Sequence, residues 1–372
     1  MSDPTPASRL GSLGRAALPV LAIVVFALAV GATLAVAGDT LGYDYRAYVG
    51  AAQRFLDGGQ LYDPSADVAG PFAVFLYPPP FALAFVPFAL APDLAGTWAW
   101  IILSVALTVG AIALMPVRRD VRWLILLLAG LDWPVVYAIK LGQVGPLLLL
   151  LFVVGWRFIH VPTVVGVVGA LGTLVKLQPG LLLGWALLRR EWRTVVVGGA
   201  ILAVVGLASI AIVGIGAWSD YAALITRVSA PVTTPHSVTP GAIVFQAGWS
   251  QPMATGLQVA TMVLTVVVWI FATLRRPAEI GYIVTIVASQ MLSPIMWDHY
   301  AMLLLLPVAL LLQRGHIWAV LVPLATSLPL VGVIPDAIYP LVFVVCLIAP
   351  IVISDRVGAA ATTRPLATEG RA

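Results

Sequence analysis

Uncharged apolar runs of about 20 residues recur along this chain of 372 residues, from residue 17 to residue 354. Each run is long enough to cross the roughly 30 Å hydrocarbon core of a membrane as a helix. Charged residues make up only 10% of the chain, whereas a soluble domain carries roughly 25%. Because the runs are continuously apolar and do not alternate, a transmembrane barrel is excluded. A soluble enzyme, a disordered protein and a nucleic-acid binder are excluded as well. The pattern predicts an all-α, polytopic integral membrane protein with about 12 transmembrane helices.

The distribution of charge predicts how the chain is oriented. Residues 1–15 contain Arg9 and Arg15 and predict a cytoplasmic N-terminal tail before a retained signal anchor. Residues 16–354 are expected to form a single transmembrane domain, and residues 355–372 a disordered cytoplasmic tail. By the positive-inside rule, the remaining basic clusters mark cytoplasmic loops: Arg118–Arg119 with Arg122, Arg157, Arg189–Arg190 with Arg193, Arg275–Arg276, Arg314 and Arg356.

Two long polar and aromatic loops are placed on the opposite side of the membrane. They cover residues 38–78 and 217–252. This arrangement predicts a multi-pass protein of the inner (plasma) membrane with its active site on the extracytoplasmic face.

Two pairs of apolar segments, 79–91 with 94–115 and 162–176 with 179–189, are interrupted by proline. Either residues 79–91 span the membrane, or they are re-entrant and both halves around Pro179 are short spans.

The first outer loop contains a segment with helical periodicity. Tyr45, Tyr48, Ala52 and Phe55 recur on one face after Asp44, which predicts an amphipathic helix lying at the membrane interface. Asp44 admits two interpretations. Its carboxylate could cap the first backbone N–H groups of the helix, or it could accept a proton from a hydroxyl substrate as a general base.

Ionisable and polar side chains also occur at breaks between the apolar runs. Lys140 and Lys176 are the only lysines in the chain, and each follows an apolar segment. A cation at this depth either snorkels to the membrane surface or binds an anionic group such as a lipid phosphate. His299 lies in the polar and aromatic segment Trp297–Tyr300, whereas His160, His236 and His316 have no such surroundings and are interpreted as structural. The buried Cys346 is interpreted as a small hydrophobe.

Four motifs in sequence order resemble those of glycosyltransferase family 87, whose members are membrane enzymes of the GT-C fold. The motifs are Asp44-x3-Tyr48-x3-Ala52 with Gly59-x2-Tyr62 and Tyr77-Pro78-Pro79; Gly142-Gln143; Lys176-x-Gln178-Pro179 followed by Arg189-Arg190-Glu191-Trp192-Arg193; and Leu292-Ser293-Pro294-x2-Trp297-Asp298-His299-Tyr300. Family members often have Lys-Pro-x-Pro where this chain has Lys176-Leu177-Gln178-Pro179.

The resemblance implies a polyprenyl-phosphate-sugar donor, with mannose as the expected sugar, and a glycolipid or glycan hydroxyl as acceptor. It implies that Asp44 is the catalytic base. Lys176, His299, Arg46 and Lys140 are expected to bind the donor phosphate. Side chains expected to contact substrate are Tyr48, Tyr62, Tyr77, Gln143, Gln178, Trp297, Asp298 and Tyr300. No cofactor and no metal are expected, because the chain has no Asp-x-Asp and only three glutamates, Glu191, Glu279 and Glu369.

The sequence thus favours a membrane glycosyltransferase that inverts the anomeric centre, but two other classes remain open. A transporter or lipid flippase would also have broken helices and embedded charges. It would rarely have a long acidic loop directly after its first helix. A non-catalytic scaffold would leave the embedded cations unexplained.

Overall fold

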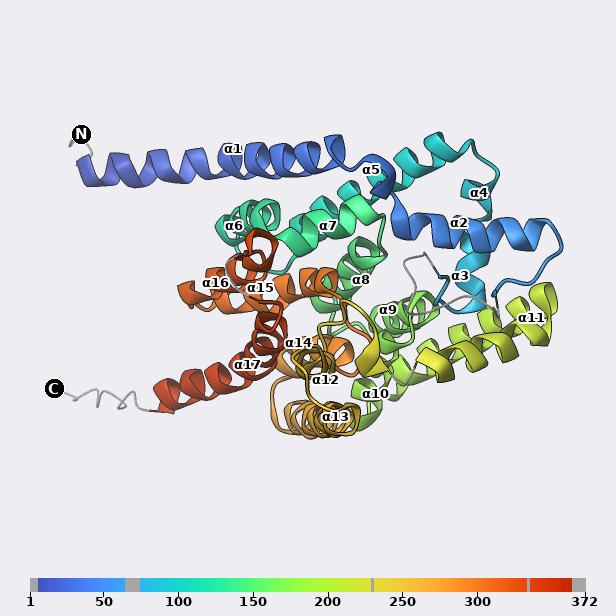
Figure 1. Cartoon of the computed structure of the whole chain (residues 1–372). Coiled ribbons are helices and arrows are strands. Elements are labelled where there is room, and N and C mark those ends of the chain that lie inside the picture. Colours follow the sequence, from blue (N-terminus) through green and yellow to red (C-terminus); the bar gives the residue numbers. More distant parts are fainter. Residues whose placement is uncertain (1–5, 64–73, 229–230, 333–334, 363–372) are drawn as a thin grey trace.

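The computed structural model describes residues 6–63, 74–228, 231–332 and 335–362, and every regular element in these ranges is helical (Figure 1). The longer helices are α1 (Pro6–Ala35), α2 (Tyr43–Leu56), α5 (Asp93–Leu114), α6 (Arg119–Leu131), α8 (Gly145–Arg157), α9 (Pro162–Val175), α11 (Trp192–Val228), α13 (Gln251–Arg275), α14 (Ala278–Met291) and α17 (Ile338–Thr362). Shorter α-helices join them: α3 (Pro79–Ala84), α4 (Val86–Ala89), α7 (Trp133–Leu141), α10 (Leu181–Leu188), α12 (Pro240–Gln246), α15 (Leu305–Gln313) and α16 (Leu321–Ala325). The 3₁₀ turns are η1 (Gly38–Thr40), η2 (Gln178–Gly180), η3 (Pro231–Thr233), η4 (Asp298–Leu304), η5 (Ile317–Val320) and η6 (Leu328–Val331).

Within the described residues, four helices are long and apolar enough to cross a membrane, and they are Ala17–Ala35, Asp93–Leu114, Trp192–Arg227 and Gln251–Arg275. A fifth candidate is the pair α6 and α7, which is bent by 68° at Asp132. Further apolar segments of 10–17 residues, two of them including an adjoining 3₁₀ turn, are shorter than these spans. The chain is therefore an all-α membrane protein. The predicted number of about 12 transmembrane helices is not confirmed.

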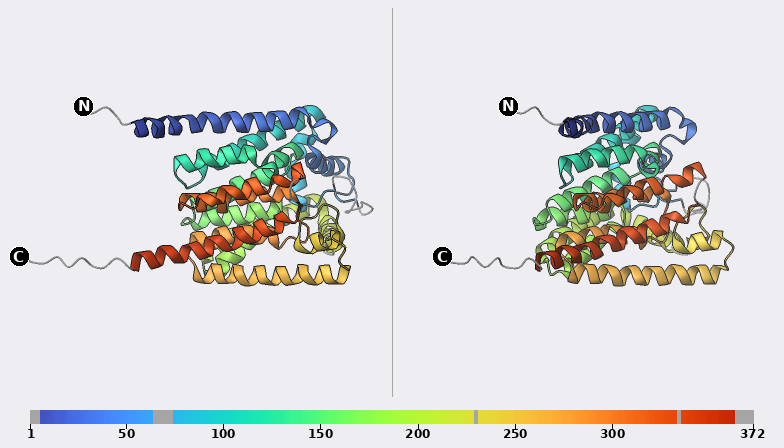
Figure 2. Two further views of the ribbon diagram at one scale, coloured as in Figure 1. Left: turned by 60° about the vertical axis from the view of Figure 1, so that its left-hand side comes forward. Right: turned by 90° about the vertical axis from the view of Figure 1, so that its left-hand side faces the viewer.

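The two ends of the helical bundle differ in composition. Both termini leave from one end, whereas α2, α12 and the long connections lie at the other (Figure 2). The end with the termini is rich in arginine and is held by polar contacts between distant segments. Arg314 Nη2 lies 2.9 Å from Glu279 Oε2, and Arg189 Nη1 donates to the carbonyl of Thr273 at 3.0 Å. We call this the arginine end and the opposite one the site end.

The structure favours the re-entrant alternative for residues 79–91. Helices α3 and α4 both pack against α2 at the site end. The rings of Phe85 and Phe88 each lie 6.1 Å from that of Tyr45, and Gly96 at the start of α5 is also close to Tyr45. The chain thus enters and leaves this segment on the same side. Arg118 consequently lies at the arginine end, where its backbone N–H donates to Gln313 Oε1 at 2.8 Å.

Helix α2 has the expected amphipathic pattern. Tyr45, Tyr48 and Ala52 are buried and Phe55 packs against the core, while Arg46 is exposed. The buried face contacts α3, α4 and α7 rather than standing alone. A position at the membrane interface remains a prediction.

Parts of the predicted terminal tails and of the first loop fall outside the described residues, and helix α1 begins at Pro6, within the expected N-terminal tail. Helix α17 continues to Thr362, into the segment expected to be a disordered tail. Residues 1–5, 64–73 and 363–372 are not described.

Candidate active site

A cavity of about 900 Å³ opens at the site end of the bundle. Its walls come from segments far apart in the sequence, because breaks in the apolar helices meet there. The lining residues are Thr40, Tyr43, Asp44, Ala47, Tyr48, Val74, Leu76, Tyr77, Trp133, Tyr137, Lys140, Leu141, Gln143, Thr234, Pro235, His236, Val238, Trp297, Asp298, His299 and Asp336. This volume is at the upper end of the range of roughly 300–1,000 Å³ for small-molecule sites.

Asp44 is placed in the cavity by the start of α2. The N-cap of this helix is Gly42, with φ +67°, so the interpretation of Asp44 as the N-cap is wrong. A side chain at Gly42 would be strained, and its Cβ would lie 2.8 Å from Thr97. The Gly42 N–H donates to the carbonyl of Lys140 at 2.9 Å, which fastens α2 to the end of α7. The Asp44 carboxylate is therefore not used to cap the helix.

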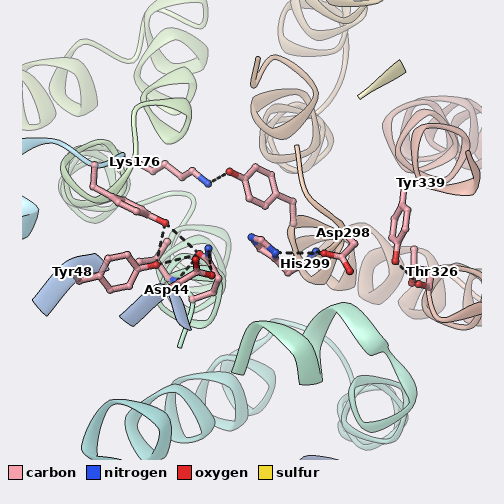
Figure 3. Close-up of polar contacts among 11 residues, drawn as sticks. Asp44, Tyr48, Lys176, Asp298, His299, Thr326 and Tyr339 are labelled. Carbon is pink, nitrogen blue, oxygen red and sulfur yellow. Dashed lines mark hydrogen bonds and ion pairs between the residues drawn. The ribbon is translucent and has the colours of Figure 1, made fainter. Parts of the chain in front are cut away.

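Gln143 links Asp44 to two buried tyrosines. Its Nε2 donates to Asp44 Oδ2 at 2.7 Å, and its Oε1 accepts from the backbone N–H of Val144 at 3.1 Å. The hydroxyls of Tyr48 and Tyr77 lie 3.0 Å apart, and each lies 3.4 Å from Gln143 Oε1 (Figure 3). Because the amide oxygen is occupied by donors, the amide N–H₂ faces the carboxylate. Gln143 was expected to contact substrate, and the structure gives it the geometry of a positioning residue.

The charge state of Asp44 is set by opposing effects. Burial raises the pKa of its carboxyl above the ordinary value, and a charge on Asp298 acts in the same direction. The charge of His299, the hydrogen bond from Gln143 and the charge of Lys176 lower that pKa again. A carboxylate whose pKa is raised above its ordinary value accepts a proton more readily.

His299 faces the cavity with one ring nitrogen unpaired. The side chain is buried, and no described residue hydrogen-bonds its Nε2. Its Nδ1 lies 3.5 Å from Asp298 Oδ1, which also accepts from the His299 backbone N–H at 2.7 Å. The ring of Trp297 is stacked at 6.0 Å. A buried polar atom without a protein partner implies that a ligand or water completes the site.

The two lysines differ in their relation to the cavity. Lys140 is a lining residue, and its Nζ lies 5.3 Å from the centre of the Tyr137 ring. Lys176 does not line the cavity. Its Nζ donates a hydrogen bond to the hydroxyl of Tyr300 and lies 3.7 Å from the centre of that ring (Figure 3). Of the two, Lys140 is therefore placed to touch a ligand directly, whereas Lys176 contacts Tyr300.

Besides Lys176, four predicted site residues lie outside the cavity wall and have structural contacts. Arg46 is exposed and donates to the backbone carbonyls of Asp39 and Leu41. The hydroxyl of Tyr62 donates to the carbonyl of Tyr77 at 2.7 Å. Gln178 Nε2 donates to Ser293 Oγ at 2.7 Å, and Tyr300 accepts from Lys176. Only Tyr48, Tyr77, Gln143, Trp297 and Asp298 of the expected substrate contacts line the cavity.

Several lining residues were not singled out from the sequence. Trp133 and Tyr137 lie four residues apart on α7, the helix that also carries the predicted Lys140, and this helical spacing could have been read from the sequence. Thr234, His236 and Asp336 come from connections whose fold no local pattern determines. His236, interpreted as structural, lines the cavity instead.

If Gln143 positions the base, its loss changes the titration of Asp44. We expect Gln143→Leu to raise the pH at which this carboxyl deprotonates by about one unit, because a hydrogen bond to a charged group contributes about 1.5–3 kcal/mol. The measurement is the carboxyl infrared band as a function of pH, with the spectrum of Asp44→Asn subtracted. Gln53→Leu, on the same helix and bonded to Asp57, is the matched control. An unchanged midpoint would show that Gln143 does not set the charge of Asp44.

Comparison with known proteins identifies the family to which the chain belongs. Glycosyltransferase family 87 matches residues 75–297 of the chain. The polyprenol-phosphate-mannose-dependent alpha-(1-2)-phosphatidylinositol mannoside mannosyltransferase of Mycobacterium tuberculosis is 25% identical over 285 residues, which are 69% of this chain and 67% of the relative. No solved structure matches. These matches favour an enzyme over the transporter and scaffold alternatives. Because the matched region covers more than half of its length, the chain belongs to glycosyltransferase family 87 and is a membrane glycosyltransferase.

Proposed function

We propose that this protein transfers mannose from a polyprenyl-phosphate donor to a hydroxyl group of a glycolipid or glycan, with inversion and with Asp44 as the general base. The observation that carries the proposal is the placement of Asp44 in one cavity with His299 and Lys140. A carboxylate held by Gln143 supplies a proton acceptor, and the two basic side chains supply partners for a phosphate. The relative from Mycobacterium tuberculosis, whose name specifies this donor, supports the choice of sugar and carrier.

The proposed step is a single displacement. The acceptor hydroxyl transfers its proton to Asp44, and its oxygen attacks the anomeric carbon as the bond from that carbon to the phosphate oxygen breaks. The electron pair of the broken bond goes to the polyprenyl phosphate, whose negative charge increases by one. Because attack and departure occur on opposite faces of the sugar, the anomeric configuration inverts.

The leaving phosphate requires positive charge or hydrogen-bond donors near it. His299 Nε2 is buried and has no hydrogen-bond partner among the described residues, and Lys140 lines the same cavity. Preorganised donors of this kind stabilise charge that develops in the transition state. Lys176 does not line the cavity and donates a hydrogen bond to Tyr300, and its positive charge favours the ionised form of Asp44. We therefore assign phosphate contact to His299 and Lys140 and an indirect electrostatic role to Lys176.

The first prediction concerns the base. Asp44→Asn is expected to lower the rate by about 10²–10⁴-fold, because general base catalysis contributes about that much. The melting temperature is expected to change little, since the amide oxygen still accepts from Gln143. The assay uses purified protein in detergent with radiolabelled polyprenyl-phosphate-mannose and membrane lipid that includes phosphatidylinositol mannosides.

The control for this variant is Asp57→Asn, which removes an exposed carboxylate at the end of the same helix. Turnover of Asp44→Asn within a few-fold of wild type would contradict the assignment of the base. Absence of transfer by the wild-type protein with this donor and lipid mixture would contradict the proposed function itself.

The second prediction concerns the donor phosphate. His299→Ala and Lys140→Ala are each expected to raise the KM for polyprenyl-phosphate-mannose by about tenfold or more, because charge-assisted hydrogen bonds contribute about 1.5–3 kcal/mol. Lys176→Ala is expected to lower kcat more than it raises this KM. His160→Ala, exposed at the arginine end, serves as the control. Wild-type donor KM in both cavity variants would exclude them as phosphate ligands.

The third prediction concerns the compartment. We propose that the site end faces the extracytoplasmic side, because the arginine end collects the basic residues and those favour the cytoplasm. A cysteine at the exposed Gln60 is expected to react with an impermeant maleimide in intact cells, and one at the exposed His160 only after lysis. Cys346 is buried and contributes little background. The reverse labelling pattern would invert the topology.

A further inference from the structure

The cavity has a deep part and an exposed rim. The deep part contains Gln143, Tyr48 and His299, whose exposed fractions are 4%, 0% and 7%. The rim contains His236 and Asp336, which are both exposed. These two residues come from separate connections, one before α12 and one at the start of α17. Neither has a role in the proposed reaction.

His236 is held over the cavity by an unusual backbone conformation. Its φ is +57°, in the left-handed region, where the only other described residue that is not glycine is Arg190. Histidine tolerates this region better than most residues, but glycine occupies it without steric cost. Glycine would adopt this conformation more easily than histidine. The presence of a histidine here therefore indicates that its side chain makes a functional contact.

The connection that carries His236 is fixed to the catalytic segment. The Val238 N–H donates to the carbonyl of Met296 at 2.7 Å, directly before Trp297 and His299. Gln246 Nε2 donates to the carbonyl of Ser237 at 3.0 Å, and Thr239 Oγ1 caps α12 by accepting from the Ala242 N–H at 3.3 Å. Ser237, Val238 and Thr239 are all buried. The exposed imidazole of His236 is therefore attached to a backbone segment that buried, hydrogen-bonded residues hold in place.

We propose that His236 and Asp336, with the indole of Trp133, form a second subsite that binds a further sugar of the acceptor, beyond the sugar that carries the attacking hydroxyl. This inference rests on the proposed function. Carboxylate and imidazole groups suit the hydroxyls of a sugar, and the apolar face of a sugar ring packs against an aromatic ring. Trp133 is a lining residue whose ring is stacked on Tyr137 at 4.8 Å.

The chemistry of the two substrates assigns this subsite to the acceptor. Beyond its sugar, the donor has only a phosphate, for which the deep part provides His299, and a hydrocarbon tail. A hydrocarbon tail is not stabilised beside an exposed carboxylate and imidazole. A cavity of about 900 Å³ is at the upper end of the range for small-molecule sites and has room for more than one sugar. The polar rim thus fits a second acceptor sugar.

The test compares two acceptors that differ by one sugar, octyl α-mannoside and octyl α-1,2-dimannoside. With polyprenyl-phosphate-mannose as donor, wild-type protein is expected to favour the dimannoside by about tenfold in kcat/KM, because a site built to hydrogen-bond a substrate discriminates against one that lacks the group. In His236→Gly and Asp336→Asn this preference is expected to fall to about threefold or less. The donor KM is expected to stay within about twofold of wild type in both variants.

The glycine variant separates a contact from a structural requirement. His236→Gly removes the side chain and also the backbone strain, so its melting temperature is expected to equal or exceed that of wild type. His160→Ala, at the opposite end of the molecule, controls for loss of an exposed histidine and is expected to keep the preference.

Equal use of the two acceptors by the wild-type protein, or a full preference in both variants, would overturn the subsite. A rise in donor KM without loss of the acceptor preference would also overturn it, since the rim would then belong to the donor. A wild-type protein that uses neither these acceptors nor membrane lipid would refute the proposed function, and the subsite with it. Transfer to membrane lipid with no transfer to either octyl glycoside would overturn the subsite alone.

Discussion

The hydrogen bond from Gln143 to Asp44 joins two parts of the chain on which the whole site depends. One part is α2, which follows the first membrane helix, and the other is the connection between α7 and α8. A half-buried carboxylate is destabilising unless donors meet it, and here the donor amide is held in place by Val144 and by two buried tyrosine hydroxyls. The same contact therefore closes the bundle at the site end and fixes the orientation of the proposed base.

The distribution of charge follows the same physical constraint. Most of the described arginines are gathered at one end, where Arg314 pairs with Glu279 and Arg189 donates to a helix-terminal carbonyl, whereas α2 at the site end carries Arg46 and Arg54. The basic groups near the cavity are instead lysine and histidine, on segments that break apolar helices. Burying an ionisable group within a membrane costs free energy, so such groups usually face a partner or a cavity. Lys176 meets Tyr300, while Lys140 and His299 line the cavity, so that one cation is paired within the protein and two are available to a substrate.

Much of this arrangement could be predicted from the sequence, but unevenly. The all-helical membrane fold follows from the apolar runs, and Asp44, Gln143 and His299 lie in one cavity as their motifs indicated. The sequence did not predict the direction in which individual side chains point. Lys140 and Lys176 occupy similar breaks, yet the extended backbone at Lys176 turns its side chain to Tyr300. Arg46 follows Asp44 by two residues, which on a helix is the opposite face, and it binds backbone carbonyls instead. The position of His236 at the cavity depends on the hydrogen bond between Val238 and Met296. These residues are far apart in the sequence, so no local sequence pattern predicts this bond.

The helix breaks themselves explain why the site lies where it does. Backbone that leaves a helix at membrane depth must be buried in protein or face a water-filled cavity, because its N–H and C=O groups otherwise lack partners. In this protein three breaks, at Gly142–Gln143, Lys176–Pro179 and Ser293–Trp297, lie close together: Gln178 bonds Ser293, and Gln143 and Trp297 line one cavity. Their polar groups satisfy one another through contacts such as Gln178 with Ser293 and Gln143 with Asp44. Convergence of the breaks creates the polar enclosure that a sugar and a phosphate require. The short helices that flank it result from the interruption of the apolar runs at these breaks.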